Sequence, residues 1–166
     1  MRTMVMGMVV VLAGSTVGIT SAQAQGEGTG AEFAVGGGVS VPTGDFDDAA
    51  KLGWHGTAAV SFVPQNVPVG FQIDGTFSRF GTEGGFDIDY QMIYGTGNVV
   101  YKFKTSEDSR FRPYLIGGGG VYNFDVKGSD VALVGDPGSE TKFGINAGAG
   151  FDFKAGSAGL FIEGRF

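Results

Sequence analysis

Apolar and polar residues alternate one by one along much of this chain, most clearly over residues 71–78, and the rhythm returns at least five more times. A period of two places successive side chains on opposite faces of an extended strand. One face collects aromatic residues, Ile, Val and Gly, whereas the other collects Gln, Asp, Thr, Asn, Glu, Arg and Lys. The pattern predicts an all-β protein and fits a barrel that is apolar outside and polar inside.

Seven strands can be placed after the N-terminal segment, and long connections alternate with short ones. Strands of about ten residues match the length of a tilted membrane-spanning strand. The run of four glycines at residues 117–120 blurs the facing of the fifth strand, so its register is the least determined. The predicted strands cover residues 32–41, 54–63, 69–80, 90–103, 111–124, 141–153 and 159–166.

The amount of charge on the polar faces separates a soluble β-protein from a membrane barrel. A soluble barrel or sandwich packs its apolar face inward and covers its outer face with charges. Each polar face here carries only one or two charges among Gly, Ala, Ser and Thr. We therefore expect an antiparallel up-and-down transmembrane barrel in which the apolar face meets lipid and the polar residues pair inside. The candidate interior residues are Glu32, Gln72, Asp74, Asn98, Lys102, Asn146, Asp152, Glu163 and Arg165.

Aromatic residues also gather near the predicted strand ends. In membrane barrels, aromatic residues at these positions form girdles at the two interfaces between lipid and water. We expect this role for Trp54, Phe80, Tyr90, Phe103, Phe111 and Phe153.

The first 24 residues have the pattern of a secretory signal. Arg2 supplies the positive charge, residues 4–13 form an apolar run, and an Ala-Gln-Ala triplet ends at Ala24. A transmembrane anchor needs about 20 apolar residues, and Gly, Ser and Thr interrupt the run too early for that. We predict a signal helix within residues 1–24, cleavage after Ala24, and an exported barrel domain over residues 25–166.

Composition narrows the remaining classes. Thirty-two glycines argue against a helical protein, and 13% aromatic residues argue against disorder. The absence of cysteine excludes disulfides and thiolate metal sites. A net charge of −6 argues against a nucleic-acid partner, which needs a basic surface.

Acidic residues are concentrated in the three long connections. Residues 42–53, 81–89 and 125–140 hold ten acids and two lysines, whereas the short turns are neutral to basic. Bacterial outer-membrane barrels have short periplasmic turns and long extracellular loops. We therefore expect the acidic loops to face outward and the barrel to start in the periplasm. The candidate loop residues are Asp45, Asp47, Asp48, Asp87, Asp89, Asp130 and Asp136.

Three motifs resemble the small outer-membrane β-barrel proteins of the OmpA/OmpX-like, Opa-like and porin-family type. They are a glycine-rich strand that runs into Val-Pro-Thr-Gly-Asp-Phe at residues 41–46, Arg-Pro-Tyr-Leu-Ile-Gly-Gly-Gly-Gly at 112–120, and Phe-Ile-Glu-Gly-Arg-Phe at 161–166. The resemblance covers residues 33–166. It implies eight antiparallel strands around an interior filled by side chains.

The strand count departs from this family pattern. Seven strands that start in the periplasm finish at the outer side, whereas bacterial barrels have an even number of strands. Two explanations remain open: the chain lacks its last strand, or residues before Glu32 are recruited into the wall. We favour the missing strand.

Candidate chemistry is sparse. His55 could serve as the base of a lipid-modifying triad, but nothing near it in the sequence supports one, and an interfacial histidine among aromatic residues is the simpler interpretation. Glu163 and Arg165 share a strand face and predict a structural salt bridge. The acids at residues 45–48 lack the spacing of a calcium loop. We expect no enzyme activity, no cofactor and no bound metal.

The sequence thus predicts a protein of the bacterial outer membrane with a structural or surface-interaction role. A narrow channel or small-ligand carrier is the alternative, and a lipid A-modifying enzyme is a distant third. The expected partners are outer-membrane lipid, lipopolysaccharide and the barrel assembly machinery, with no nucleic acid.

Overall fold

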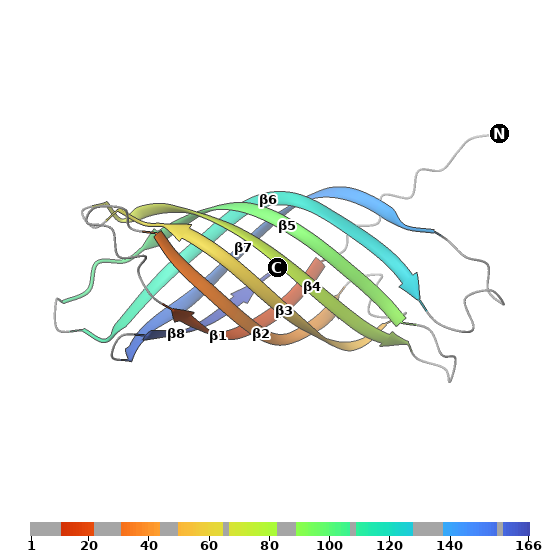
Figure 1. Ribbon diagram of the computed structural model, residues 1–166, viewed down its shortest axis with the longest axis horizontal. Helices are drawn as coiled ribbons and strands as arrows, with labels where there is room; N and C mark the ends of the chain where they lie inside the picture. Colours follow the sequence, from red (N-terminus) through yellow and green to blue (C-terminus); the bar gives the residue numbers. More distant parts are fainter. Residues whose placement is uncertain are drawn as a thin grey trace.

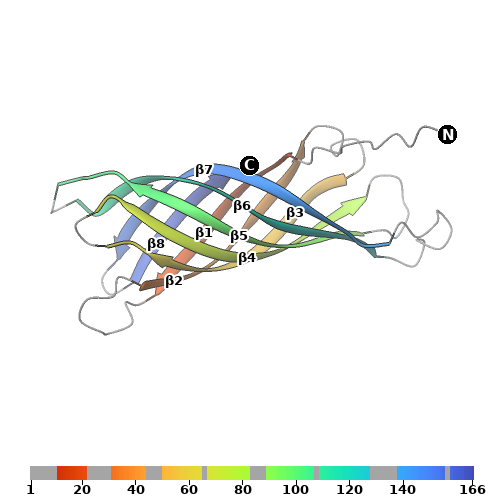
Figure 2. The same ribbon diagram turned by 90° about the horizontal axis from the view of Figure 1, so that it is seen from above.

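The protein is a closed antiparallel β-barrel in which every strand pairs with its neighbours in sequence and the last strand pairs with the first. Figures 1 and 2 show the strands inclined to the long axis and wrapped around a single lumen. The computed structural model describes residues 11–21, 31–43, 50–64, 67–82, 89–106, 109–127, 138–155 and 158–166. Among these residues, no helix has the length and apolarity that crossing a membrane requires.

Eight strands make up the wall. Most are longer than predicted, whereas the last strand, at eight residues, is the shortest. The strands are β1 (Val11–Ser21), β2 (Ala31–Thr43), β3 (Ala50–Phe62), β4 (Val69–Thr82), β5 (Asp89–Lys102), β6 (Phe111–Lys127), β7 (Glu140–Ala155) and β8 (Ala158–Arg165).

The seven strands expected after the N-terminal segment are all present as β2 to β8. The expectation that the eighth position stays empty is wrong, because β1 pairs with β2 on one side and with β8 on the other. Recruitment of residues before Glu32, the less favoured explanation, is what the structure shows. Pairing of β1 with the open edges of β2 and β8 is strongly favoured, since each unpaired backbone group in lipid costs several kcal/mol. Cleavage after Ala24 stays a prediction.

The two faces of the wall follow the predicted alternation. In β2 the side chains of Phe33, Val35 and Val39 point outward, and Ser40 is buried. On β7 Phe143 and Ile145 are 88% and 91% exposed. Large apolar side chains so fully exposed would form an unfavourable patch in water, but they suit contact with lipid.

The strand ends that flank the three long connections lie at one end of the barrel, where β4 and β6 finish (Figure 1). We call this the long-loop end and the opposite one the short-turn end. Val11 pairs with Thr43 and so begins β1 at the long-loop end. We expected the first strand to start at the short-turn end. β2, the first strand that the sequence predicted, does start there, but β1 comes before it and starts at the opposite end, so the expectation is wrong.

The last strand stops partway along the wall. Phe166 exchanges two backbone hydrogen bonds of 2.9 Å with Ala147, in the middle of β7. The C-terminus accordingly lies near the middle of the long axis in both views (Figures 1 and 2). Among the described residues, the part of β7 between Glu140 and Asn146 pairs only with β6.

An aromatic girdle is present on the outer face at the short-turn end. Phe111 stacks on Phe151 with ring centroids 4.8 Å apart and contacts Phe153 at 5.3 Å. Phe103 is also exposed at this end, whereas the exposed Trp54 lies near the start of β3, toward the long-loop end. Phe80 does not belong to a girdle, because its position in the alternation turns it inward, where it is 1% exposed. Tyr90 packs with it inside the barrel.

The glycine run in β6 pairs with β5 in a regular register, and two of its glycines lie too close to β5 for a side chain. Gly118 lies opposite Asn98, and Gly120 lies opposite Thr96. A Cβ atom at either position would come within 2.7 Å of the Cα atom of the residue that it faces. Glycine therefore allows the close approach of the β5 backbone at both positions, and at Gly118 it also leaves space for the Asn98 amide oxygen.

Inward aromatic rings lie over glycines of neighbouring strands. Tyr114 of β6 pairs with Gly150 of β7, and a Cβ at Gly150 would touch the tyrosine ring and lie 2.7 Å from the carbonyl oxygen of Ile162. Phe161 covers Gly18 and Gly36 in the same way. These rings can fold sideways into the lumen only because their neighbours have no side chain.

Candidate functional site: the barrel lumen

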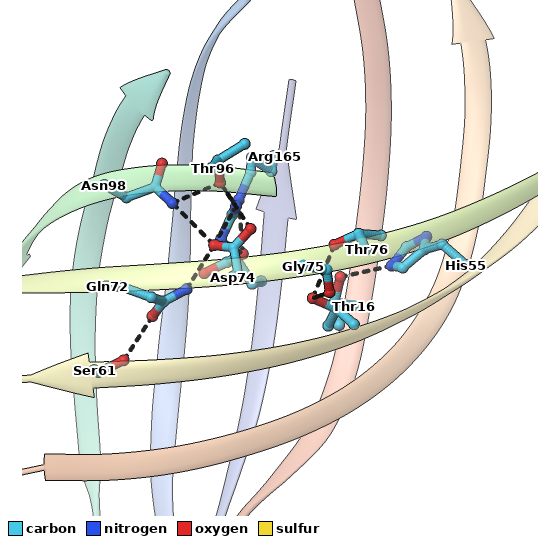
Figure 3. A network of polar contacts seen from close by, with 12 residues as sticks. Thr16, His55, Ser61, Gln72, Asp74, Gly75, Thr76, Thr96, Asn98 and Arg165 are labelled. Atoms are coloured by element: carbon cyan, nitrogen blue, oxygen red, sulfur yellow. Dashed lines mark hydrogen bonds and ion pairs between the residues drawn. The ribbon is translucent and has the colours of Figure 1, made fainter. Parts of the chain in front are cut away.

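A carboxylate at the centre of the lumen organises most of the polar side chains. Asp74 of β4 is 3% exposed and accepts hydrogen bonds from Thr96 at 2.7 Å and from Asn98 at 2.9 Å. Gln72 donates at 3.1 Å and the Arg165 guanidinium at 2.9 Å (Figure 3). A buried carboxylate is tolerated when its charge is paired and its oxygens are hydrogen-bonded, and Asp74 meets both conditions.

Arg165 links this carboxylate to the opposite wall. The guanidinium extends from β8, where Nη2 lies 2.7 Å from Glu163 Oε1 and Nε donates to the same oxygen at 3.0 Å. Tyr114 donates a hydrogen bond of 2.9 Å to the other oxygen of Glu163. The salt bridge predicted between Glu163 and Arg165 is thus present, and it is part of a chain of contacts from β6 through β8 to β4.

A second ionic cluster lies nearer the short-turn end. The Lys102 ammonium of β5 is 3.0 Å from Glu32 of β2 and 3.0 Å from Asp152 of β7. Lys102 therefore joins three strands that are not neighbours in the wall.

Apolar clusters separate these polar layers. Phe80 and Met92 are 1% and 2% exposed and pack with Tyr90, Tyr94, Tyr122 and Phe124 toward the long-loop end. Val100, Tyr114 and Ile116 form a smaller cluster toward the short-turn end. These clusters fill part of the lumen with side chains, as expected for eight strands.

All nine candidate interior residues lie on the inner face, and each is buried or half-buried. The structure brings Gln72, Asp74, Asn98, Glu163 and Arg165 into one network, and Glu32, Lys102 and Asp152 into another. Asn146 joins neither. Of the loop candidates, Asp89 begins β5 and pairs with Arg79. The others, Asp45, Asp47, Asp48, Asp87, Asp130 and Asp136, lie outside the described residues.

The expectation that His55 lies at the interface among aromatic residues is wrong. Alternation turns Trp54 outward and His55 inward, so that they are 54% and 6% exposed. The His55 ring nitrogens lie 2.7 Å from the Thr16 hydroxyl and 2.8 Å from the Ser40 hydroxyl. Both hydrogen bonds of the ring go to hydroxyl groups of the described chain and none to a carboxylate, so the oriented base of a triad is not assembled.

A cavity of about 540 Å³ remains in the lumen beside the Arg165 bridge. Residues of all eight strands line it, and they include His55, Tyr94, Tyr122, Asn146, Phe161 and Arg165. No group of three His, Asp or Glu side chains able to hold a metal ion occurs in the described part of the chain. The cavity is thus walled by aromatic rings, hydroxyl groups and the amides of Gln72 and Asn146 in addition to paired charges.

The aromatic residues of this cavity were not among the candidate site residues. The signal for them was available, because Tyr94 has the same phase as Thr96 and Asn98, and Phe161 has the phase of Glu163. Aromatic residues on an otherwise polar face are the feature that would have identified them.

We predict that Asp74→Ala strongly destabilises the barrel. The substitution leaves Arg165 buried without its cross-lumen partner, which typically costs about 3 kcal/mol or more. Urea unfolding of detergent-folded protein, followed by Trp54 fluorescence, measures the loss. Asp89→Ala is the matched control, because its ion pair with the 47%-exposed Arg79 side chain is worth at most about 1 kcal/mol. Equal unfolding midpoints for the two variants would contradict a stabilising role for the Asp74 network.

Comparison with known proteins agrees with this architecture. Neisserial surface protein A (NspA) has a similar structure with a TM-score of 0.50 and 13% identity, over 93% of each chain. Ail, the attachment invasion locus protein of Yersinia pestis, solved with the heparin analogue sucrose octasulfate, gives 0.45 and 16%, over 96% of this chain and 100% of that one. No curated protein matches the sequence. The profile described as outer membrane protein beta-barrel domain matches residues 10–162, and the chain belongs to this family.

Proposed function

We propose that this outer-membrane barrel is a non-conducting structural protein whose long loops form an interaction surface outside the cell. The observation that carries the proposal is the ion pair between Arg165 and Asp74. In a closed barrel of eight strands, β8 and β4 lie four positions apart and therefore on opposite walls. An ion pair between them crosses the lumen near its centre and obstructs a straight aqueous path.

The second ionic cluster supports the same conclusion. Lys102 connects β5 with β2 and β7 through two carboxylates at 3.0 Å. Lys102 is the buried member, and separating it from both carboxylates for the passage of an ion would leave its charge unpaired inside the lumen. The interior is therefore better suited to holding the wall together than to conduction.

The acidic loops supply the proposed surface. With ten acids and two lysines in the three long connections, the long-loop end carries a strong negative charge. Such a surface suits lipopolysaccharide bridged through divalent cations, and loops are the usual place for external contacts. We further propose that the chain reaches its membrane through the barrel assembly machinery.

We predict that the purified protein shows no steady unit conductance in planar bilayers. The double variant Asp74→Ala/Arg165→Ala removes the bridge together with both charges, and we expect it to produce openings. Arg79→Ala/Asp89→Ala, which removes an ion pair of the long-loop end, is the control and should stay silent. Steady openings of the unmodified protein would favour the channel instead.

We predict that the long loops face the outside of the cell. The chain has no cysteine, so Asp130→Cys in a long loop and Ser106→Cys in a short turn each introduce a single thiol. A membrane-impermeant maleimide should label Asp130→Cys in intact cells and Ser106→Cys only after lysis. The opposite result would invert the orientation and remove the proposed surface.

We propose that residues 1–24 direct export. Their cleavage after Ala24 competes with the place of β1 in the wall, and the intact mass of the protein from purified outer membranes decides between the two. Cleavage predicts the mass of a chain that begins at Gln25. Such a chain lacks β1, so another strand would have to pair with the open edges of β2 and β8. A mass that includes residues 1–24 would contradict cleavage and would favour β1 as part of the mature wall.

A further inference from the structure

The wall has a gap beside β7 at the long-loop end. Among the described residues, β7 between Glu140 and Asn146 pairs with β6 alone, and β1 between Val11 and Ala13 pairs with β2 alone. Lower in the wall, β8 lies between β7 and β1, so the gap is one strand wide. Because neighbouring strands lie about 4.8 Å apart, a gap of one strand measures about 10 Å.

The backbone of β7 directs hydrogen-bonding groups into this gap. Ala147 donates a backbone hydrogen bond to Phe166 of β8 and accepts one from it. In an antiparallel ladder, every second residue directs its N–H and C=O to the same side. The N–H and C=O of Ile145 and Phe143 therefore point into the gap, whereas those of Gly144 point to β6. Such groups are costly to leave unpaired in hydrocarbon.

The side chains of this edge are also uncovered. Phe143 and Ile145 are 88% and 91% exposed, whereas Phe71 and Ile73 of β4, which has a strand on each side, are 63% and 71% exposed. A neighbouring strand covers part of an outward side chain, and β7 lacks one here. Phe143 and Ile145 also line the lumen cavity, although their side chains face outward. The cavity therefore reaches the gap.

From these features we infer that this edge of β7 is a docking site for an extended segment of another polypeptide, which pairs with it as an added strand. A peptide backbone supplies donors and acceptors at the two-residue spacing of the edge, and a lipid chain supplies none. β7 and β1 both run from the long-loop end to the short-turn end, so a segment that runs the opposite way is antiparallel to both. The site lies in the wall, apart from the proposed surface of the long loops.

The surroundings of the gap define the residues of such a segment. Its outward side chains lie beside Phe143 and Ile145 and meet lipid, so they are apolar. Its inward side chains lie near the Tyr122 ring, which covers Gly144, so they are small. The partner is therefore a stretch of about six residues in which apolar and small residues alternate. The edge of β7 does not depend on β1, and it stays open if residues 1–24 are cleaved.

The test uses isotope-labelled protein purified from outer membranes in detergent, and a dye-labelled peptide that copies residues 33–41 of β2. This stretch places Phe33, Val35 and Val39 on one face and Ala and Gly on the other, and in the barrel it runs toward the long-loop end and pairs with β1. Fluorescence anisotropy measures the binding of the peptide, which we expect at about 10 μM.

Hydrogen exchange measured by NMR reports on the edge itself. Without peptide, the Phe143 and Ile145 amides should exchange at least about tenfold faster than the Gly144 amide, which faces β6. The peptide should slow the exchange of the first two and leave the third unchanged. Protection of Phe143 and Ile145 before peptide is added would overturn the inference, because the edge would then already be covered.

Two proline substitutions test the backbone hydrogen bonds from either side. Ile145→Pro removes the N–H that faces the gap and spares the pairing with β6, so it should weaken peptide binding at least about tenfold relative to Ile145→Ala, which loses the side chain but keeps the N–H. Val35→Pro in the peptide should have the same effect on the unmodified protein, and it serves alone if Ile145→Pro does not show the heat-modifiable migration of a folded barrel. Equal binding of the two peptides, or binding that leaves both amides unprotected, would contradict an added strand.

Discussion

Backbone hydrogen bonding in lipid is the constraint on which this structure depends. A strand that borders hydrocarbon has no water to satisfy its N–H and C=O groups, so each edge must meet another strand. Closure of eight strands meets this requirement for most of the wall, and the part of β7 between Glu140 and Asn146 is the exception among the described residues. Closure has three consequences. One face of every strand must be apolar, the other must fill a narrow lumen, and polar groups in that lumen must satisfy one another.

Polar groups in the lumen satisfy one another because glycines in the wall leave room for them. Glycines at positions 118 and 120 allow the close approach of the β5 backbone that carries Thr96 and Asn98, and Gly150 lets the Tyr114 ring reach Glu163. Aromatic rings and paired charges then alternate along the axis. Small residues in the wall and large residues in the lumen are therefore two halves of one packing arrangement, because a ring can lie flat only where its neighbour lacks a side chain.

Much of this fold could be predicted because alternation with a period of two is a local property. The facing of Phe33, Phe71, Asp74 and Asn98 follows directly from it, as does the polar interior. His55 and Phe80 were misassigned because their residue type was given more weight than their phase, although the phase decides orientation. The same alternation places Asn146 inside, but which side chains it meets depends on how the strands face one another across the lumen.

The N-terminal segment shows a different limit. A secretory signal and a membrane strand draw on the same small and apolar residues, so the sequence VLAGSTVGITS of β1 supports either interpretation. The choice depends on whether β2 and β8 have another partner, and this is a property of the assembled wall. Likewise, alternation shows that Asp74 and Arg165 both face the lumen, but it does not show that β4 and β8 bring them together.

The position of that bridge bears on the order of folding. Asp74 and Arg165 are separated by 91 residues in sequence, and their contact requires β4 and β8 to stand on opposite sides of a nearly finished ring. Contacts between such distant residues form slowly, since the entropy of closing the intervening chain must be overcome first. The ion pair is therefore among the last contacts to form, and it locks the ring after closure instead of guiding it.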